Sequence, residues 1–180
     1  MSNIEKTIAL PLDEDGFFRR ECPLCCKEFK ILLSQEELTV LAQEGLDSFL
    51  LDKKDKAVDS DKEDGDDKKE YFCPYCGQQA LYDQWWTKEQ LAYVHVVAEN
   101  IIASIMNESF INPLKSSLRG NSFIKFEAKE LKQTEPWISP ETNDMKVINL
   151  LCCQKKIKVE ENWNQKTHCY FCGFPHQAGD

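Results

Sequence analysis

The sequence predicts an α+β fold in which two small cysteine-bearing β modules lie around a long central helix and a strand. A Cys-x-x-Cys pair occurs near each end of the chain. From residue 88, apolar residues recur at steps of three and four, which is the period of a helix. Residues 122–129 instead alternate between apolar and charged side chains, as a half-buried strand does. With 180 residues, of which 42% are hydrophobic, the chain is long enough to bury a core.

Charge and cysteine content restrict the setting of the protein. The nine cysteines are an odd number and the first residues lack the basic-then-apolar layout of a secretory leader, so we expect reduced thiols and a cytoplasmic protein. No run of about 18 apolar residues occurs, so we expect no membrane partner. The net charge of -9 disfavours sequence-independent binding to phosphate backbones, and any nucleic-acid site would have to be a local patch.

The first predicted helix begins after Ser34. Ser34 and Glu37 have the spacing of a capping box, and the apolar residues that follow share one helical face. Gly45 is placed to end this short helix. From residue 52 to residue 70 there are nine acids and six bases with almost no large apolar side chain, which predicts a flexible solvated loop over 52–70.

A second and longer helix is predicted in the middle of the chain. Thr87 and Gln90 form another capping-box pattern, and the apolar period that follows predicts a helix from Lys88 to Ile111. Pro113 lies just beyond this end, where a proline cannot continue the helix but does no harm.

Strand patterns follow the long helix. Besides the strand expected over 122–129, Pro136 and Pro140 mark an irregular connector. Residues 146–151 and 157–159 then predict two strands on either side of a pair of adjacent cysteines.

Two matching Cys-Pro-x-Cys pairs predict a metal site in the N-terminal part. A two-residue spacer lets a tight turn aim both sulfurs at one ion, so each pair is half of a tetrahedral zinc site. Between the pairs, 47 residues separate Cys25 from Cys73. Compared with a loop of roughly 15 residues this adds about 1 kcal/mol of closure entropy, whereas structural zinc supplies about 10 kcal/mol or more. The long insertion is therefore compatible with metal binding.

The same pattern recurs near the end of the chain. Residues 167–173 parallel residues 71–77, which places Cys169 and Cys172 in a second site. Two residues again separate these two cysteines, and a glycine follows the second, as in the Cys73–Cys76 pair of the first site. A second zinc ion is therefore expected.

In such a site each cysteine-bearing turn is called a knuckle, and the knuckle that should supply the other two ligands of this second site is irregular. Residues 153–158 align with residues 25–30, which makes Cys153 a ligand and puts Leu150 where another cysteine is expected. Adjacent residues of a strand point to opposite faces, so Cys152 can join Cys153 only if the chain turns there. The sequence leaves three candidates for the fourth ligand, namely Cys152, His168 and His176.

Eight of the nine cysteines are thus expected to hold two zinc ions. The expected ligands are Cys22, Cys25, Cys73, Cys76, Cys152, Cys153, Cys169 and Cys172. Cys26 stays outside both sets, and we expect it to be a buried spectator thiol.

The N-terminal knuckles resemble the zinc ribbon, including the transcription factor IIB type, in which each knuckle is the tip of a β-hairpin. The resemblance covers residues 17–31 and 71–80. It implies two small zinc-ribbon-like β modules, the N-terminal one with a long insertion and the C-terminal one degenerate. We expect the N-terminal ribbon with its helical and acidic insertion in residues 1–84, the central helix and strand in 85–135, and the C-terminal ribbon in 136–180.

A second resemblance spans most of the chain. Residues 17–22, 85–90 and 141–145 look like the corresponding parts of a group of bacterial zinc-ribbon proteins of uncharacterised function. This similarity implies a metal-binding protein of the bacterial cytoplasm, and it brings no activity with it.

Catalysis is not expected. Cys73-Pro74-Tyr75-Cys76 also matches the redox motif of glutaredoxins, which makes a thiol-disulfide oxidoreductase a remote alternative. The motif, however, follows an acidic loop instead of a β–α–β unit, and a second Cys-Pro-x-Cys pair awaits a partner. Four cysteines also fill a zinc tetrahedron and leave no position for a reactive water. We therefore expect no catalytic residue, no organic cofactor and no enzyme.

The function expected from these observations is recognition. The favoured interpretation is an adaptor or regulatory module that binds another protein, and the alternative is a nucleic-acid-binding zinc ribbon. The densest basic group on the ribbon halves consists of Arg19, Arg20, Lys27 and Lys30. Glu21 and Glu28 lie within it, which favours a solvated mixed face over a phosphate-binding one.

Overall fold

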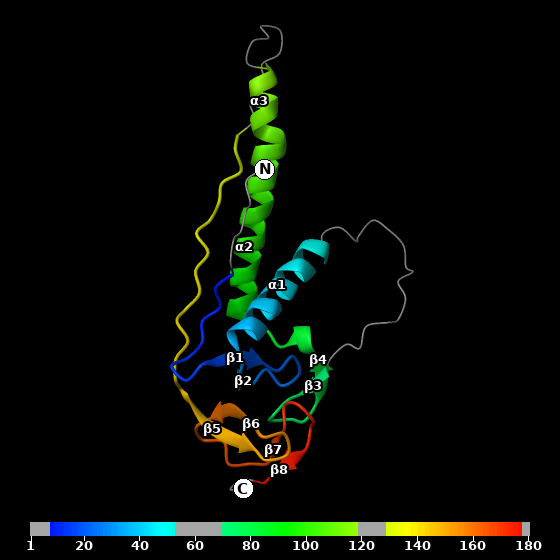
Figure 1. Cartoon of the computed structure of the whole chain (residues 1–180), viewed down its shortest axis with the longest axis vertical. Helices are drawn as coiled ribbons and strands as arrows, with labels where there is room; N and C mark the ends of the chain where they lie inside the picture. Colours follow the sequence, from blue (N-terminus) through cyan, green and yellow to red (C-terminus); the bar gives the residue numbers. More distant parts are fainter. Residues whose placement is uncertain (1–7, 53–69, 119–128, 178–180) are drawn as a thin grey trace, which may run out of the picture.

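The computed structural model describes residues 8–52, 70–118 and 129–177. It shows an α+β protein with a long central helix and small antiparallel sheets, as expected (Figure 1). The predicted loop over 52–70, apart from its two end residues, and the predicted strand over 122–129, apart from its last residue, lie outside the described residues.

A four-stranded antiparallel sheet forms the centre of the fold. Its strands are, in spatial order, β1 (Phe17–Glu21), β2 (Glu28–Leu32), β6 (Lys155–Glu160) and β5 (Met145–Leu150). We call the ribbon-like module built on the hairpin β1–β2 the N-terminal ribbon and the one built on β5–β6 the C-terminal ribbon. The pairing of β2 with β6 joins the two. The strands predicted over 146–151 and 157–159 are confirmed, each shifted or extended by a residue or two.

Two short hairpins carry the remaining knuckles. They are β3–β4 (Glu70–Phe72 and Gln79–Leu81) and β7–β8 (Thr167–His168 and Pro175–His176). A single 3-10 turn, η1 (Tyr82–Gln84), leads from β4 toward the long helix. Each ribbon therefore consists of one hairpin in the shared sheet and one short hairpin beside it.

The two ribbons are arranged around an internal twofold axis. Residues 25–30 align with residues 153–158 in the sequence, and the sheet places Lys30 directly opposite its aligned mate Lys158. Because the two strands run antiparallel through this pair, a half-turn about it exchanges β2 and β6.

The short hairpins repeat this exchange through reciprocal contacts. The backbone N–H of Phe72 donates to the carbonyl of Tyr170 at 2.9 Å, and the N–H of His168 donates to the carbonyl of Pro74 at 2.9 Å. Phe72 and His168 both precede the first cysteine of a Cys-x-x-Cys pair, and Pro74 and Tyr170 both follow it. Each ribbon is therefore hydrogen-bonded to the other at matching positions.

One hydrophobic core serves both ribbons. Phe29 of β2 is fully buried, and its ring centroid lies 5.7 Å from that of Trp85 and 5.4 Å from that of Tyr170. The buried members of this core are Cys22, Phe29, Ile31, Cys73, Tyr75, Trp85, Leu150, Ile157, Val159, Cys169 and Tyr170. Since they come from both ribbons, the two ribbons are expected to fold as one cooperative unit.

The opposite face of the sheet buries charge. Lys30 and Lys158 are 0% and 1% exposed, although like charges directly opposite each other in a sheet repel. One oxygen of Asp13, Oδ2, accepts from the Nζ of Lys158 at 2.8 Å and from the Nζ of Lys30 at 3.2 Å. The buried carboxylate of Asp13 thus lies between two ammonium groups and offsets their repulsion.

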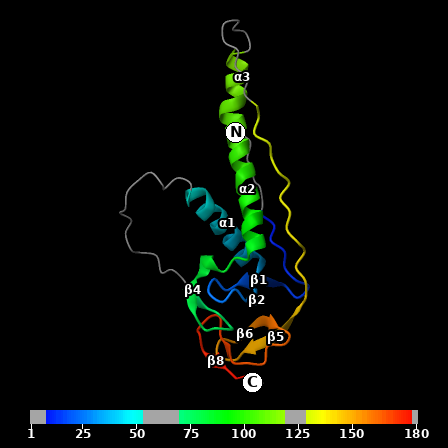
Figure 2. The same cartoon turned by 180° about the vertical axis from the view of Figure 1, so that it is seen from behind.

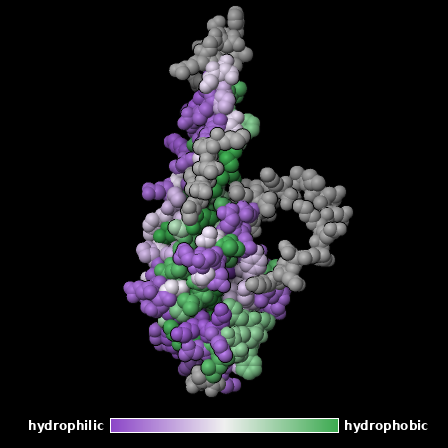
Figure 3. All heavy atoms as spheres, viewed as in Figure 1, coloured by the Kyte–Doolittle hydropathy of each residue, from purple (hydrophilic) through white to green (hydrophobic). Residues whose placement is uncertain are grey.

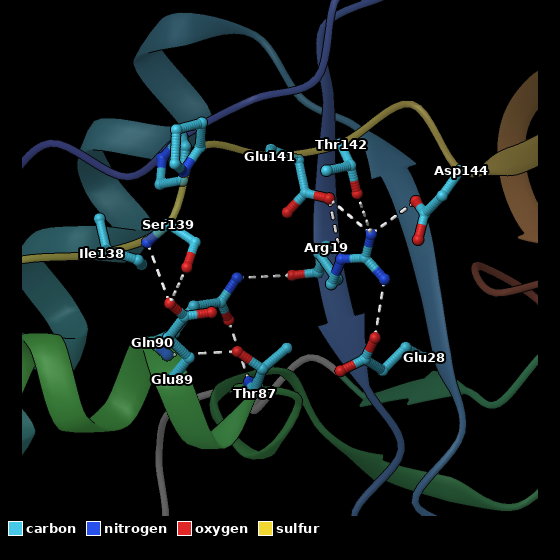
Figure 4. Close-up of a pocket in the computed structure, with 12 residues that line it drawn as sticks. Arg19, Glu28, Thr87, Glu89, Gln90, Ile138, Ser139, Glu141, Thr142 and Asp144 are labelled. Carbon is cyan, nitrogen blue, oxygen red and sulfur yellow. Dashed lines mark hydrogen bonds and ion pairs between the residues drawn. The ribbon is translucent and has the colours of Figure 1, made fainter.

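Arg19 extends this charged layer toward the connector (Figure 4). Its guanidinium donates to Glu28 at 2.7 Å, to Glu141 at 2.8 Å and to Asp144 at 2.6 Å. A pocket of about 300 Å³ lies beside these groups, and the side chain of Gln90 on the long helix closes its other side by donating to the Arg19 carbonyl at 2.9 Å. The connector is therefore attached to the sheet by ion pairs.

Helix α1 (Gln35–Asp52) begins as predicted but is longer. The side chains of Ser34 and Glu37 cap each other's backbone N–H groups at 3.2 and 2.8 Å, which confirms the capping box. The prediction that Gly45 ends the helix is wrong. A Cβ at Gly45 would lie 2.8 Å from Cζ2 of Trp86, so the glycine is the point at which the helix approaches that ring closely. Packing there outweighs the helix-weakening effect of glycine, about 1 kcal/mol.

The long central helix also continues past its predicted end. Helix α2 (Lys88–Met106) is capped by Thr87 and Gln90 as expected, and it runs through a π turn, η2 (Asn107–Ile111), into α3 (Asn112–Leu118). Pro113 lies inside α3, so the prediction of an end before this residue is wrong. In the π turn the N–H of Asn112 donates to the carbonyl of Asn107, five residues back. This wider turn accommodates a proline, which has no N–H and clashes with a carbonyl at α-helical spacing.

The connector predicted around Pro136 and Pro140 has no regular structure and runs back along the helix (Figure 2). Asn100 donates to the carbonyl of Thr134 at 2.6 Å and accepts from its N–H at 2.8 Å. Asn107 makes the same paired contact with Leu131, at 2.9 and 2.8 Å. Two asparagine amides of the helix thus hold the extended backbone as a neighbouring strand would.

Candidate metal centres

Four cysteine sulfurs meet where the β1–β2 turn faces the β3–β4 turn. The group consists of Cys22, Cys25, Cys73 and Cys76, whose sulfurs all lie within 4.8 Å of one another. The Sγ atoms of Cys22 and Cys76 are 3.9 Å apart, and those of Cys25 and Cys73 are 3.6 Å apart. Four sulfurs bound to one zinc ion at about 2.3 Å stand about 3.8 Å from one another. The spacing in the structure therefore fits a tetrahedral thiolate site.

The backbone of each knuckle is shaped to aim its sulfurs. The N–H groups of Leu24 and Cys25 both point at the Cys22 sulfur, at 3.4 Å. After the second cysteine the chain turns through a residue with positive φ, which is Gly77 (70°) in one knuckle and Cys26 (56°) in the other. Such a residue lets the backbone curl around a metal ion.

This geometry corrects the expectation for Cys26. We expected a buried spectator thiol, but Cys26 is exposed. It occupies the position that glycine takes in the β3–β4 and β7–β8 turns. Gln154 has the corresponding conformation in the other ribbon, with φ of 51°, as the alignment of residues 25–30 with 153–158 implies. The sequence signal was this alignment with Gln154, since a glutamine is an unusual mate for a core cysteine.

A second group of four sulfurs has formed in the C-terminal ribbon. It consists of Cys152, Cys153, Cys169 and Cys172, again within 4.8 Å of one another. Strand β5 ends at Leu150 and residues 151–154 form a turn, in which the N–H of Cys153 donates to the carbonyl of Leu150 at 3.3 Å. This turn brings two adjacent cysteines to one side, and the Sγ atoms of Cys152 and Cys172 are 3.5 Å apart.

The fourth ligand of the second site, Cys152, lies two positions beyond the place that the alignment predicts, and Leu150 occupies that place. It aligns with Cys22, and both residues are fully buried in the shared core. A leucine there fills the space with apolar atoms, and the sulfur that the metal site needs comes from Cys152. The second site therefore keeps four sulfurs although its motif looks damaged.

The two histidines that the sequence left open lie in different places. His168 packs against the first ribbon, where its Nε2 would lie 2.9 Å from a Cβ on Gly77. His176 is buried next to the second group, with its Nε2 3.2 Å from the Sγ of Cys152. At that distance the imidazole can donate a hydrogen bond to the sulfur and so orient it, as groups around metal ligands commonly do.

The pKa values of the thiols indicate that each group of four sulfurs needs a cation. Burial raises the pKa of Cys73 and the pKa of Cys152 far above the ordinary range of a thiol. The pKa of Cys153 rises to about 11, first through its hydrogen bond with Cys172 and then through burial. One thiol in each group shifts the other way: the backbone N–H of Phe174 lowers the pKa of Cys172, and that of Gln78 lowers the pKa of Cys76 against the effect of burial. Four crowded sulfurs cannot all ionise alone, and a divalent cation among them removes this obstacle.

Comparison of the chain with models of known families, with curated proteins and with solved structures gave no match. Among residues 8–52, 70–118 and 129–177, no helix combines the length and the apolar character needed to cross a membrane.

Proposed function

We propose that this chain is a non-catalytic zinc protein that acts as an interaction module, binding another protein through a scaffold held by two structural zinc ions. The observation that carries the proposal is the pair of four-cysteine groups, each assembled from two knuckles that face each other. Closed four-sulfur sites are typical of structural zinc, whereas catalytic zinc sites keep a position for water. We also propose that the modules belong to the zinc-ribbon type and that the protein works in the bacterial cytoplasm.

A redox role for Cys73 and Cys76 finds less support. Both sulfurs belong to the first four-sulfur group, and Cys73 is fully buried. Thiol-disulfide exchange requires an accessible, acidic thiol, usually at the start of a helix. In this chain the pair lies in the turn between the short strands β3 and β4.

The basic group that would favour nucleic acid is engaged inside the protein. Lys30 is buried among Asp13, Glu141 and Asp144, and the three acids that contact Arg19 neutralise its charge. Arg20 is 1% exposed. Lys27 lies 2.9 Å from a carboxylate oxygen of Glu160. None of these four cations is therefore presented as a free phosphate contact, which supports a protein partner over a nucleic acid.

Apolar surface on the projecting helix points the same way. Hydrophobic residues reach the surface along the helix as well as among polar residues at the ribbon end (Figure 3). Ile105, Phe110 and Leu114 are 48%, 62% and 43% exposed. These exposed apolar side chains are available for contacts with a protein partner.

Metal analysis of the purified protein is expected to give two zinc ions per chain, because both groups offer four sulfurs. Inductively coupled plasma mass spectrometry with a protein assay on the same sample measures this ratio. A value near one would contradict the second site, and a red iron-containing protein would contradict the choice of metal.

Electrophoretic mobility separates the two kinds of partner. We expect no shift of single- or double-stranded DNA or RNA at 50 mM salt, because the clustered cations are already paired. Binding that weakens steeply between 50 and 200 mM salt would instead support the nucleic-acid alternative.

Affinity purification of the tagged protein from its host, with a chelated sample as control, then tests for a protein partner.

A further inference from the structure

We propose that a groove between α1 and the β3–β4 hairpin is the site that receives the partner, and that it takes a peptide segment with a tryptophan beside lysine or arginine residues. This inference rests on the proposed function as an interaction module. The groove has a volume of about 690 Å³. Its apolar lining includes Val40, Leu41, Tyr71, Leu81, Tyr170 and Phe171.

The C-terminal ribbon shows how this protein holds a tryptophan side chain. In the C-terminal ribbon, Trp163 lies on Tyr75 with ring centroids 4.8 Å apart and planes at 81°. The Nζ of Lys27 is 5.3 Å from the Trp163 ring, and the indole N–H donates to Thr167 at 3.2 Å. An aromatic ring, a lysine and a strand residue together hold one tryptophan.

The twofold-related residues line the groove without a tryptophan among them. Phe171 aligns with Tyr75, Lys155 with Lys27, and Tyr71 with Thr167. The Nζ of Lys155 lies 6.0 Å from the Phe171 ring, as the Nζ of Lys27 lies 5.2 Å from Tyr75. Within the described part of the chain, Phe171 has ring contacts with Tyr71 and Tyr170 only. Phe171 and Lys155 therefore repeat the aromatic ring and the lysine of the indole receptor, with Tyr71 in the place of Thr167, and no residue that lines the groove supplies an indole.

Arg20 in the wall of the groove gives an independent reason to expect a ligand. Its Nη2 donates to the carbonyl of Tyr82 at 2.6 Å and its guanidinium carbon lies 5.3 Å from the centre of the Trp86 ring, but Nε and Nη1 are buried without a well-formed hydrogen bond among the described residues. A buried donor without an acceptor is costly, by about 1–3 kcal/mol. An extended peptide carries backbone carbonyls, which are the kind of acceptor that Nη2 already uses.

The charge around the groove selects basic flanks. Glu36, Glu37 and Glu44 of α1 and Asp83 of η1 form an exposed acidic rim, against which the lining sets only Lys155 and the buried Arg20. A cationic segment is therefore attracted to the rim, and an acidic one is repelled. The net charge of -9 on the whole chain adds to this preference at long range.

A labelled peptide, Lys-Lys-Leu-Trp-Leu-Lys-Lys, tests the proposal by fluorescence anisotropy with the zinc-loaded full chain. We expect binding, and about tenfold weaker binding when alanine replaces the tryptophan at unchanged charge. Phe171→Ala should weaken binding of the tryptophan peptide about tenfold, and Glu44→Lys should weaken it and reduce its salt dependence. Phe174→Ala is the matched control: this aromatic residue lies three positions away, is 57% exposed and does not line the groove, so affinity should not change.

Zinc content is measured on every variant, so that a folding defect is recognised, and Glu44→Lys keeps the test valid if Phe171→Ala is unstable. Equal binding of the tryptophan and alanine peptides, or no binding at 1 mM, would overturn the proposal. A partner protein from the host that is retained equally by Phe171→Ala and Glu44→Lys would overturn the groove while leaving the interaction module intact. Loss of both zinc ions from the wild-type protein would instead refute the proposed function.

Discussion

Replacing Cys73 by serine is expected to unfold the whole protein, including the C-terminal ribbon that does not contain this residue. The substitution removes one of four sulfurs from the first group, and a structural zinc ion contributes about 10–16 kcal/mol to folding. Total stabilities of domains are about 5–15 kcal/mol, so the loss exceeds what the rest of the fold provides. Because β2 pairs with β6 and the core is shared, the C-terminal ribbon loses a neighbouring strand and half of its packing.

Circular dichroism together with zinc analysis checks this outcome, and Cys26→Ser is the matched control. Cys26 lies one residue from a cysteine of the first group, but it is exposed and outside both groups. The Cys26 variant should keep two zinc ions and a wild-type melting curve. A folded Cys73→Ser protein that had only lost thiol-disulfide exchange would contradict the structural role and favour redox chemistry.

Asp13→Asn is expected to cost about 3–5 kcal/mol of unfolding free energy, as does removal of one partner from other buried ion clusters. The substitution keeps the shape of the side chain but leaves Lys30 and Lys158 opposite each other without their shared counter-ion. Urea denaturation measures the change. Asp15→Asn is the control, because Asp15 also contacts Lys158, at 2.6 Å, but its side chain is 54% exposed, so we expect a small effect.

A second substitution shows whether the loss comes from the lysines. In the double variant Asp13→Asn with Lys158→Met one of the two buried charges is absent, so part of the stability should return. If the double variant is destabilised by the sum of the two single losses, the interaction between Asp13 and Lys158 is not the cause.

The ion cluster around Asp13 also makes the free energy of unfolding depend on pH. Burial alone would raise the pKa of Asp13, but the hydrogen bonds from Lys158, from the Phe17 N–H and from Lys30 hold this pKa below its ordinary value of 3.8. A carboxylate with a lowered pKa contributes stability above its unfolded pKa and loses it as pH falls through the folded value. Wild-type stability should therefore fall below about pH 4, and Asp13→Asn should lack this part of the fall.

Local signals in the sequence were sufficient for most elements. The capping boxes at Ser34 and Thr87 give the starts of both helices, since their partners lie three residues away. Seven of the eight cysteines of the two groups are recognisable from spacing and from internal repetition, whereas Cys152 joins its group only because the chain turns after β5. Where the helices end was less predictable, because the packing of Trp86 on Gly45 and the π turn before Pro113 are not local propensities.

Long-range pairing is what the sequence concealed. Nothing near Lys30 indicates that it lies opposite Lys158, and a lysine in a strand normally points to solvent. The basic group around Arg19 therefore looked like a surface feature, although the connector and Asp13 cover it. The groove was equally hidden, since its walls come from segments that meet only when the two ribbons pair.

The β2–β6 pairing also has a consequence for the order of synthesis. During translation the N-terminal ribbon emerges first, and both of its knuckles are complete by residue 76, long before β6 (Lys155–Glu160) is made. Until then β2 is an edge strand with unpaired backbone groups, and Phe29 lacks the Tyr170 ring that covers part of it in the complete fold. A nascent chain or a C-terminally truncated product therefore exposes the edge of β2, to which a strand of another chain can add. Strand β6, in the last quarter of the sequence, protects this edge from aggregation.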